Sequence, residues 1–145
     1  MEEITTFKCC VSTSDPTAML GLEVWFDGEK FFDQEHINGS AELTHYFDDL
    51  DGAHEIKFVL KNKTDKDTKI DEHGNIIKDA VITINNFMLD SVNVDQLISE
   101  KSTYVHNNNG HSEELTTNFF GSMGCNGTVT FKFNSPIYLW LLENL

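Results

Sequence analysis

Arginine is absent from the sequence, and all ten basic residues are lysine. Proteins that bind nucleic acid usually present a basic patch in which arginine contacts phosphate and guanine. The 24 acidic residues give a formal net charge of -14 at pH 7, so negative charge dominates. We therefore expect no nucleic-acid partner. An acidic surface suits divalent cations and keeps a protein soluble through self-repulsion.

Cysteine is also scarce, and the three residues are Cys9, Cys10 and Cys125. The number is odd, and adjacent residues on a strand point to opposite faces, so no disulfide framework is expected. The sequence has no Cys-x-x-Cys pair and its six histidines are scattered, which argues against a zinc site. This usage indicates a reducing compartment or small buried side chains.

Long apolar runs and catalytic signatures are missing as well. No run approaches 18 apolar residues, so we expect no membrane-spanning helix and no membrane partner. The first residues, MEEITTF, lack an apolar core, so we expect synthesis without a signal peptide, and the compartment stays open. There is no Gly-x-Ser-x-Gly elbow, and a pair of glycosidase carboxylates cannot be recognised without a cleft. We expect a protein that is not an enzyme.

The apolar residues that are present make up 39% of the chain, and aromatic residues make up 11%. This is enough for one folded domain over residues 1–145. Residues 20–32, LGLEVWFDGEKFF, contain two alternating arms around Asp27-Gly28, a strong hairpin signal. The register then follows, with Phe26 opposite Glu29, Trp25 opposite Lys30 and Val24 opposite Phe31. Side chains alternate, so one face must be covered by a second layer, and it carries Leu20, Leu22, Val24, Phe26 and Phe31.

Turn signals such as Asn-Gly and Asp-Gly recur along the chain, as in sandwiches and barrels. The predicted fold class is all-β, a single antiparallel β-sandwich of jelly-roll type with about eight strands. Besides the hairpin, the predicted extended segments are 3–11, 41–48, 54–62, 80–89, 91–98, 118–120 and 128–134, with a minor hairpin over 70–77. Segment 80–89 is apolar on both faces, which is typical of a strand covered on each side. The tail from Pro136 is either an edge strand or a helical turn.

One acidic loop is the best metal candidate. Asp65, Asp67 and Asp71 place carboxylates along a polar segment, and calcium takes six to eight oxygen ligands in such loops. An EF-hand loop starting at Asp65 fails, because its fifth and sixth positions hold Lys69 and Ile70. A solvated acidic loop is the alternative interpretation.

A second polar loop has the residue types that bind sugars. Sugars stack on aromatic rings and exchange hydrogen bonds with planar amides. An ordinary Asn-rich turn is the alternative. Trp25 is a further candidate ring, or half of a cation–π pair with Lys30. The loop residues predicted to bind a ligand are Tyr104, His106, Asn107, Asn108, Asn109 and His111.

The C-terminal segment PIYLWLLENL gathers large apolar side chains. They either fold back over the core or dock onto another subunit, since exposed apolar patches mark interfaces. In the second case the chain forms a homo-oligomer. The predicted interface residues are Tyr138, Trp140 and Leu141.

The span 20–94 resembles the small jelly-roll carbohydrate-binding modules of the calcium-dependent xylan-binding type. The likeness rests on LEVWFDGEKFF, on the strand HEIKFVLKN that supplies Asn62, and on DAVITINNFMLDSV, which Asp79 leads. Lys63 stands where the family has the aspartate of an Asn-Asp step. The resemblance implies a calcium cofactor held by Asn62 and Asp79, in contact with sugar hydroxyls.

The composition, acidic, rich in lysine and asparagine and free of arginine, is similar to that of small structural proteins of marine bacteriophages. Two functional hypotheses follow. The first is a non-catalytic module that binds a polysaccharide or cell-surface glycan. The alternative is a virion structural or assembly protein that uses its apolar C-terminus at a subunit interface.

Overall fold

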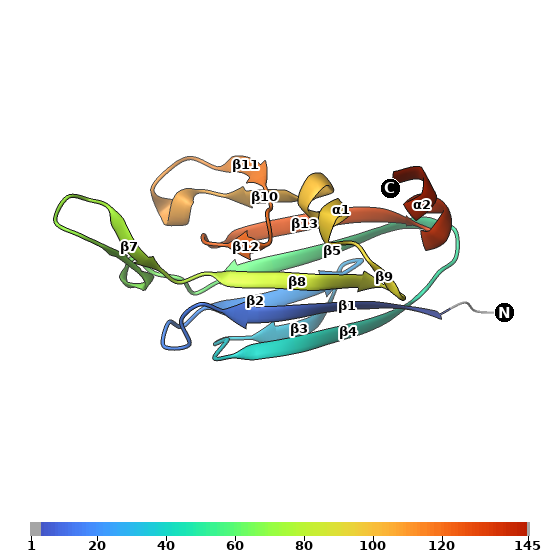
Figure 1. Ribbon diagram of the computed structural model, residues 1–145, viewed down its shortest axis with the longest axis horizontal. Helices are drawn as coiled ribbons and strands as arrows, with labels where there is room; N and C mark the ends of the chain where they lie inside the picture. The colour runs from blue at the N-terminus through green and yellow to red at the C-terminus, as the bar shows by residue number, and fades with distance from the viewer. Residues whose placement is uncertain (1–3, 145) are drawn as a thin grey trace.

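The computed structural model describes residues 4–144, and its strands form two antiparallel sheets that pack face to face (Figure 1). This confirms the predicted β-sandwich. One sheet has the order β12-β8-β1-β4, with β9 paired to β8, and the other has the order β11-β10-β13-β5-β2-β3. Strands β6 and β7 form a separate hairpin. Glu3, where the first predicted strand starts, lies outside the described residues.

The strands are β1 (Ile4–Thr13), β2 (Gly21–Phe26), β3 (Glu29–Gln34), β4 (Ser40–Asp48), β5 (Gly52–Lys61), β6 (Thr68–Ile70), β7 (Ile76–Asp79), β8 (Ile82–Leu89), β9 (Val92–Asn93), β10 (Thr103–His106), β11 (Leu115–Asn118), β12 (Ser122–Met123) and β13 (Gly127–Ser135). The helices are η1 (Asp65–Asp67), α1 (Asp95–Lys101), η2 (Asn108–Gly110) and α2 (Ile137–Asn144).

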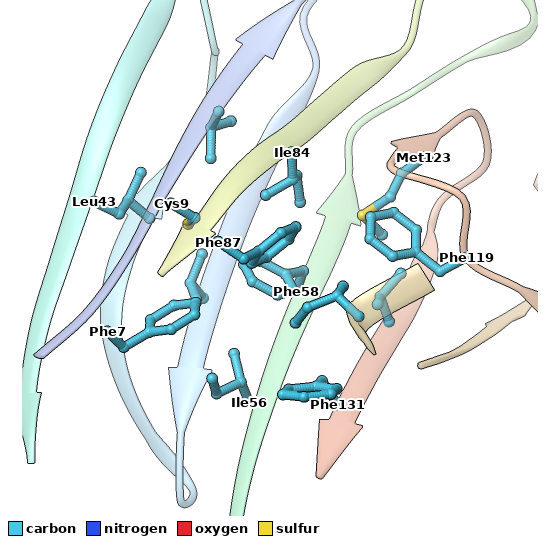
Figure 2. Close-up of a cluster of buried hydrophobic side chains, with 14 of the residues drawn as sticks. Phe7, Cys9, Leu43, Ile56, Phe58, Ile84, Phe87, Phe119, Met123 and Phe131 are labelled. Atoms are coloured by element: carbon cyan, nitrogen blue, oxygen red, sulfur yellow. The ribbon is translucent and has the colours of Figure 1, made fainter. Parts of the chain in front are cut away.

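The core lies between the two sheets and is rich in phenylalanine (Figure 2). Phe7 comes from one sheet, Phe58 and Phe131 come from the other, and all three are fully buried. Each such side chain contributes roughly 1.5–3 kcal/mol when it leaves water. The period-two alternation in the sequence therefore produces the two inner faces.

The central hairpin forms at the predicted turn, where Asp27 and Gly28 both have positive φ angles of 49° and 83°. The first two predicted pairs are present, but a bulge between Val24 and Trp25 shifts the register. Val24 therefore lies opposite Phe32 and not opposite Phe31, as the unbroken register had predicted. The extra residue of a bulge changes the phase of every pair beyond it.

In strand β8, apolar residues occupy both sets of alternating positions in the sequence, and an irregular residue explains this as well. Ile82 and Ile84 are buried, then Asn86 takes a positive φ of 53°, and beyond it Phe87 and Leu89 are buried. The irregular residue moves the inward positions by one. The prediction of a strand covered on each face is wrong. A single face of β8 is buried, and the positions that point into it shift by one residue along the strand.

The predicted strand 91–98 is also wrong beyond its first residues, because α1 begins at Asp95. The Asn93 side chain accepts a hydrogen bond from the Asp95 backbone N–H (3.0 Å), and Leu97 and Ile98 pack into the core. The C-terminal segment is the helix α2, one of the two predicted alternatives. Among residues 4–144 no helix is long and apolar enough to cross a membrane.

The two ends of the sandwich differ. Helix α2 covers one end, while the β6–β7 hairpin and the η2 loop extend from the other (Figure 1). The polar loops singled out in the sequence meet at this second end.

Candidate functional site

A cavity of about 420 Å³ opens between the β6–β7 hairpin, the η2 loop and the loop before β13. We call it the end pocket. It combines residues of the predicted metal set with residues of the predicted ligand loop, which are far apart in the sequence. The lining residues are Asp65, Thr68, Ile70, Ile76, Asp79, Asn109, His111, Gly124 and Cys125.

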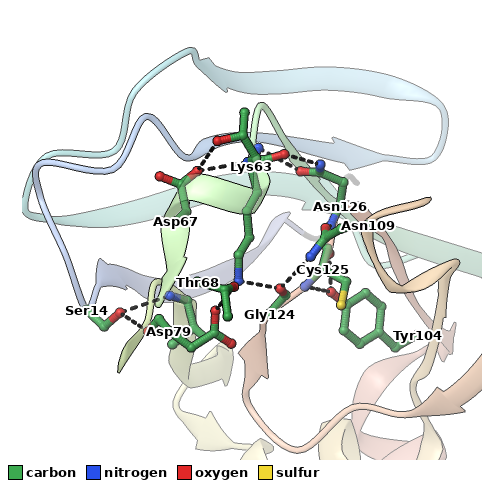
Figure 3. Close-up of polar contacts among 12 residues, drawn as sticks. Ser14, Lys63, Asp67, Thr68, Asp79, Tyr104, Asn109, Gly124, Cys125 and Asn126 are labelled. Atoms are coloured by element: carbon green, nitrogen blue, oxygen red, sulfur yellow. Dashed lines mark hydrogen bonds and ion pairs between the residues drawn. The ribbon is translucent and has the colours of Figure 1, made fainter. Parts of the chain in front are cut away.

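The wall of the end pocket rests on a buried lysine. The Lys63 ammonium group donates hydrogen bonds to Asp79 Oδ1 and to the Gly124 carbonyl oxygen, both at 2.6 Å (Figure 3). The Lys63 side chain is 0% exposed, whereas that of Asp79 is 33% exposed. Thr68 Oγ1 donates to the same Oδ1 at 2.6 Å. A buried charge of this kind is tolerated because it is paired and hydrogen-bonded.

The Asn126 side chain fixes the backbone that delivers this lysine. Its Oδ1 accepts from the Lys63 N–H (3.0 Å), and its Nδ2 donates to the Lys63 carbonyl (2.8 Å) (Figure 3). Asn109 Oδ1 in turn accepts from the Asn126 N–H at 2.8 Å. The pocket wall is therefore one network that ties the η2 loop to the end of β5.

The second oxygen of Asp79 lies at the pocket wall beside Gly124, another lining residue. Oδ2 takes no hydrogen bond from residues 4–144, and a Cβ atom built on Gly124 would lie 3.5 Å from it. Across the pocket, His111 Nε2 lies 2.8 Å from Asp65 Oδ1. Burial raises the pKa of the Cys125 thiol, so this lining group stays protonated. The pocket thus offers two carboxylates, an imidazole and a hydroxyl.

Two isoleucines supply the apolar part of the pocket. Ile70 and Ile76 come from the two strands of the hairpin and are 59% and 65% exposed. None of the lining residues is phenylalanine, tyrosine or tryptophan. A ligand in the end pocket would therefore contact aliphatic side chains in place of a stacking ring.

The five residues of the predicted metal set do not come together. Asp65 and Asp79 line the end pocket, and the other three turn elsewhere. Among residues 4–144 no three His, Cys, Asp or Glu side chains are placed to hold one metal ion. The hydrogen-bond partners are Glu35 for Asn62, His111 for Asp65, Thr64 for Asp67, His73 and Asn75 for Asp71, and Lys63 and Thr68 for Asp79.

The calcium cofactor implied by the sequence resemblance does not fit this arrangement. Calcium binds oxygen at about 2.3–2.6 Å. The Lys63 nitrogen already lies at 2.6 Å from Asp79 Oδ1 and from the Gly124 carbonyl oxygen. An ion at that point would overlap the ammonium group and be repelled by it.

Tyr104 corrects the predicted ligand loop. It is only 5% exposed, so its ring cannot stack on a sugar. Its hydroxyl donates to the Cys125 carbonyl and accepts from the Cys125 N–H, and burial raises its pKa. Tyr104 therefore holds the backbone of the lining residue Cys125, and Figure 3 shows the two residues side by side.

Some of the other residues of this loop line the end pocket, as the ligand-binding prediction expects, and others only form an Asn-rich turn. Asn109 and His111 line the end pocket, whereas His106 and Asn107 line a separate cavity of about 390 Å³. Asn107 Oδ1 accepts from the Gly110 N–H (2.9 Å) and caps η2. Asn108 donates to Ser112, so these two asparagines are turn residues.

Trp25 lies away from the end pocket, half-buried on the outer face of β2. Its Nε1 donates to Glu23 Oε1 at 3.0 Å, and Lys30 Nζ lies 5.7 Å from the ring centroid. The cation–π alternative is therefore present. A separate cavity of about 430 Å³ adjoins this ring.

Two of the predicted interface residues belong to the chain's own core. Trp140 and Leu141 are 7% and 3% exposed, and Trp140 packs edge-on against Phe131 and Phe133. They are not available to a partner, so the prediction that they form a subunit interface is wrong. Tyr138 is 49% exposed and donates to Asp90 Oδ2 at 2.6 Å.

A chain of three polar residues at the α2 end went unnoticed in the sequence. Asp27 Oδ2 lies 2.7 Å from His54 Nδ1, and His54 Nε2 lies 2.9 Å from Ser135 Oγ. These contacts follow the order of a Ser-His-Asp triad. Ser135, however, is 7% exposed and does not line the adjacent cavity, so its hydroxyl cannot reach a substrate. These hydrogen-bonded residues hold the β2–β3 turn against β5.

Sequence reasoning also did not find Thr68, Gly124 and Asn126. None belongs to a motif, and only the folded chain brings them to Lys63. The one available signal was Lys63 itself, a basic residue within an acidic loop pattern.

Comparison with known proteins identifies fold neighbours. No protein-family model and no curated protein sequence matches the chain. A solved structure of vCBM60 in complex with galactobiose is 12% identical, with a TM-score of 0.49 over 87% of this chain and 96% of that one.

A second solved structure, the selenomethionine form of vCBM60, is 10% identical, with a TM-score of 0.50 over 90% of this chain and 91% of that one. For that protein, circular permutation provides an evolutionary link between two families of calcium-dependent carbohydrate-binding modules. The resemblance found in the sequence is thus confirmed at the level of the fold, a jelly-roll β-sandwich.

Proposed function

We propose that the chain is a non-catalytic module that binds an uncharged glycan in the end pocket. The observation that carries this proposal is the pocket itself, which places the open Oδ2 of Asp79 and the Asp65–His111 pair beside exposed isoleucines. Carboxylate oxygens accept hydrogen bonds from sugar hydroxyls, and aliphatic side chains cover the apolar face of a ring. The carbohydrate-binding module that shares the fold supports this assignment.

Charge narrows the ligand class. The net charge is -14, and Asp65 and Asp79 both face the pocket. An anionic glycan would meet repulsion from these carboxylates, whereas a neutral one can donate hydroxyl hydrogens to them. We therefore expect neutral hexose or pentose oligomers to bind and uronate or sulfated oligomers to be excluded.

Recognition without cleavage is the activity that we expect of the end pocket. A glycosidase needs two carboxyl groups on opposite sides of the scissile bond, one as a proton donor and one as a base or nucleophile. Both pocket carboxyl groups are already engaged within the chain, Asp79 with Lys63 and Thr68 and Asp65 with His111. Incubation with neutral oligosaccharides should therefore release no new reducing ends, and steady product formation would refute the non-catalytic assignment.

The binding test uses the exposed His111. In a glycan array followed by titration calorimetry, His111→Ala should weaken binding about 3- to 10-fold, the value of one hydrogen bond. Ile76→Asp should weaken it further by adding charge to the apolar side. His73→Ala, a change at an exposed histidine outside the pocket, should leave affinity unchanged. A protein that binds no neutral glycan, or a His111→Ala variant that binds like the parent, would contradict the proposal.

A further inference from the structure

Lys63 lies behind the wall of the end pocket, and the oxygen atoms there bind its ammonium group in the way that they would bind a metal ion. Its Nζ is 2.6 Å from a carboxylate oxygen of Asp79 and 2.6 Å from the carbonyl oxygen of Gly124, and the side chain is fully buried. Thr68 Oγ1 shares the same carboxylate oxygen (Figure 3). An ammonium group is buried without great cost only where oxygen acceptors surround it. These oxygens therefore form a site for one positive charge.

We propose that the Lys63 ammonium group is the resident cation of the end pocket and that the pocket binds its ligand without calcium. The consequence for the ligand rests on the glycan-binding function proposed above, whereas the position of the cation does not. The ammonium group neutralises Asp79 through Oδ1 and leaves Oδ2, which lies beside the lining residue Gly124, without a hydrogen-bond donor among residues 4–144. A bound ion would do the same, but a covalently attached charge cannot dissociate.

The supporting contacts hold this lysine in place through its backbone. Asn126 bonds both the N–H and the carbonyl of Lys63, at 3.0 and 2.8 Å, and so fixes where the side chain starts. The Gly124 carbonyl accepts from Asn109 Nδ2 (3.4 Å) as well as from the lysine. The η2 loop that lines the pocket is thus coupled to the cation through the same oxygen.

The first test is thermal unfolding of the unaltered protein. It compares calcium at about 10 mM, which saturates sites with Kd of about 10⁻⁴–10⁻³ M, with magnesium at the same concentration and with EDTA. Magnesium controls for general screening of the acidic surface. We expect equal Tm values in calcium and magnesium. A Tm that rises in calcium alone would overturn the proposal.

The second test asks whether the oxygens accept a metal once the ammonium group is gone. Lys63→Asp removes the fixed cation and adds a carboxylate beside Asp79. We expect this variant to have a reduced Tm in EDTA and to recover part of it in calcium, with a matching calorimetric heat. A folded variant that ignores calcium would show that these oxygens do not form a cation site. The measurement on the parent protein decides the proposal even where the variant does not fold.

Glycan binding in EDTA separates this inference from the proposed function. Undiminished binding after chelation supports both. Binding that vanishes in EDTA and returns with calcium overturns the resident-cation proposal and leaves glycan recognition standing. Absence of any glycan binding, together with equal Tm values in calcium and magnesium, refutes the function and leaves the assignment of Lys63 intact.

Discussion

Lys63 shows how much one side chain can decide at the residue scale. In sequence it is one of ten lysines, set in an acidic segment where carboxylates invite a metal interpretation. In the fold it is the fully buried member of an ion pair with Asp79. The acidic spacing singled out Asp65 and the family resemblance singled out Asp79, both as metal ligands, and both line the pocket. Neither could show that the charge between the loops comes from the chain itself.

Replacing this lysine gives a stability prediction. Lys63→Met removes the ammonium donor from the Asp79 carboxylate and the Gly124 carbonyl, which keep only the hydrogen bonds from Thr68 and Asn109. The Asp79 side chain is 33% exposed. We therefore expect a loss of about 3 kcal/mol in urea unfolding, the lower end for a broken buried pair.

The matched control lies in the same loop, where Lys66 is exposed. Lys66→Met should change the free energy of unfolding by less than about 0.5 kcal/mol, as is usual for a surface substitution. Equal urea midpoints for Lys63→Met and Lys66→Met would mean that the buried pair contributes nothing.

At the scale of elements, the sequence predicted strands where alternation stays in phase and failed where the phase breaks. Strand β5 alternates cleanly from His54 to Lys61 and was identified without error in type. The bulge after Val24 and the irregular residue Asn86 depend on contacts with neighbouring strands, which a single segment does not contain. The helix α1 was mistaken for a strand because its buried face is short.

The same limit explains the ligand loop. Its residue types are those of a sugar site, and two of them, Asn109 and His111, do reach the pocket. Composition alone could not tell that Tyr104 packs inward and that Asn107 closes a turn. Burial is a property of the two sheets together, so the orientation of a loop residue follows only from the packed structure.

The turn between β2 and β3 provides a prediction for an element. Asp27 accepts hydrogen bonds at 2.7 Å from the Glu55 N–H and from His54, while its own φ is positive. Asp27→Ala removes these acceptors and tolerates the backbone angle poorly, so we expect a loss of about 2 kcal/mol in denaturant unfolding. Asp27→Asn keeps an acceptor and the tolerated angle and should lose less than half as much. Equal losses in both variants would show that the hydrogen bonds of the Asp27 carboxylate do not account for the lost stability.

At the scale of the whole molecule, the residues at the two ends of the sandwich have different roles. At the α2 end, Trp140 packs against the core and His54 joins Asp27 to Ser135, and the cavity of about 370 Å³ beside them is lined by groups that hold the fold together. The opposite end keeps its polar groups around an open cavity. A rigid two-sheet scaffold with functional loops at one end is a common arrangement in binding domains. Ten lysines are available on this scaffold to offset the charge of 24 acidic residues.

Lys61 is the main such lysine, because its ammonium group bonds Glu23, Asp33 and Glu35 at 2.7–3.0 Å. Its hydrogen bonds lower the pKa of Glu23 and of Glu35. The pKa of Asp33 is lowered first by the hydrogen bond from Lys30 and then by the one from Lys61. Carboxyl groups with a lowered folded-state pKa stabilise the fold above their unfolded values of 3.8 to 4.5. This stability is lost as the pH falls through the folded values.

The acid dependence of stability should therefore change when Lys61 is replaced. From neutral pH to about pH 3, urea midpoints of the parent protein should fall, and those of Lys61→Met should start lower and fall less steeply, because Glu23 and Glu35 then titrate nearer their ordinary pKa. Lys132→Met, at a lysine 76% exposed, should keep the steepness of the parent. Parallel curves for the parent and Lys61→Met would show that the acid sensitivity arises elsewhere among the 24 acidic residues.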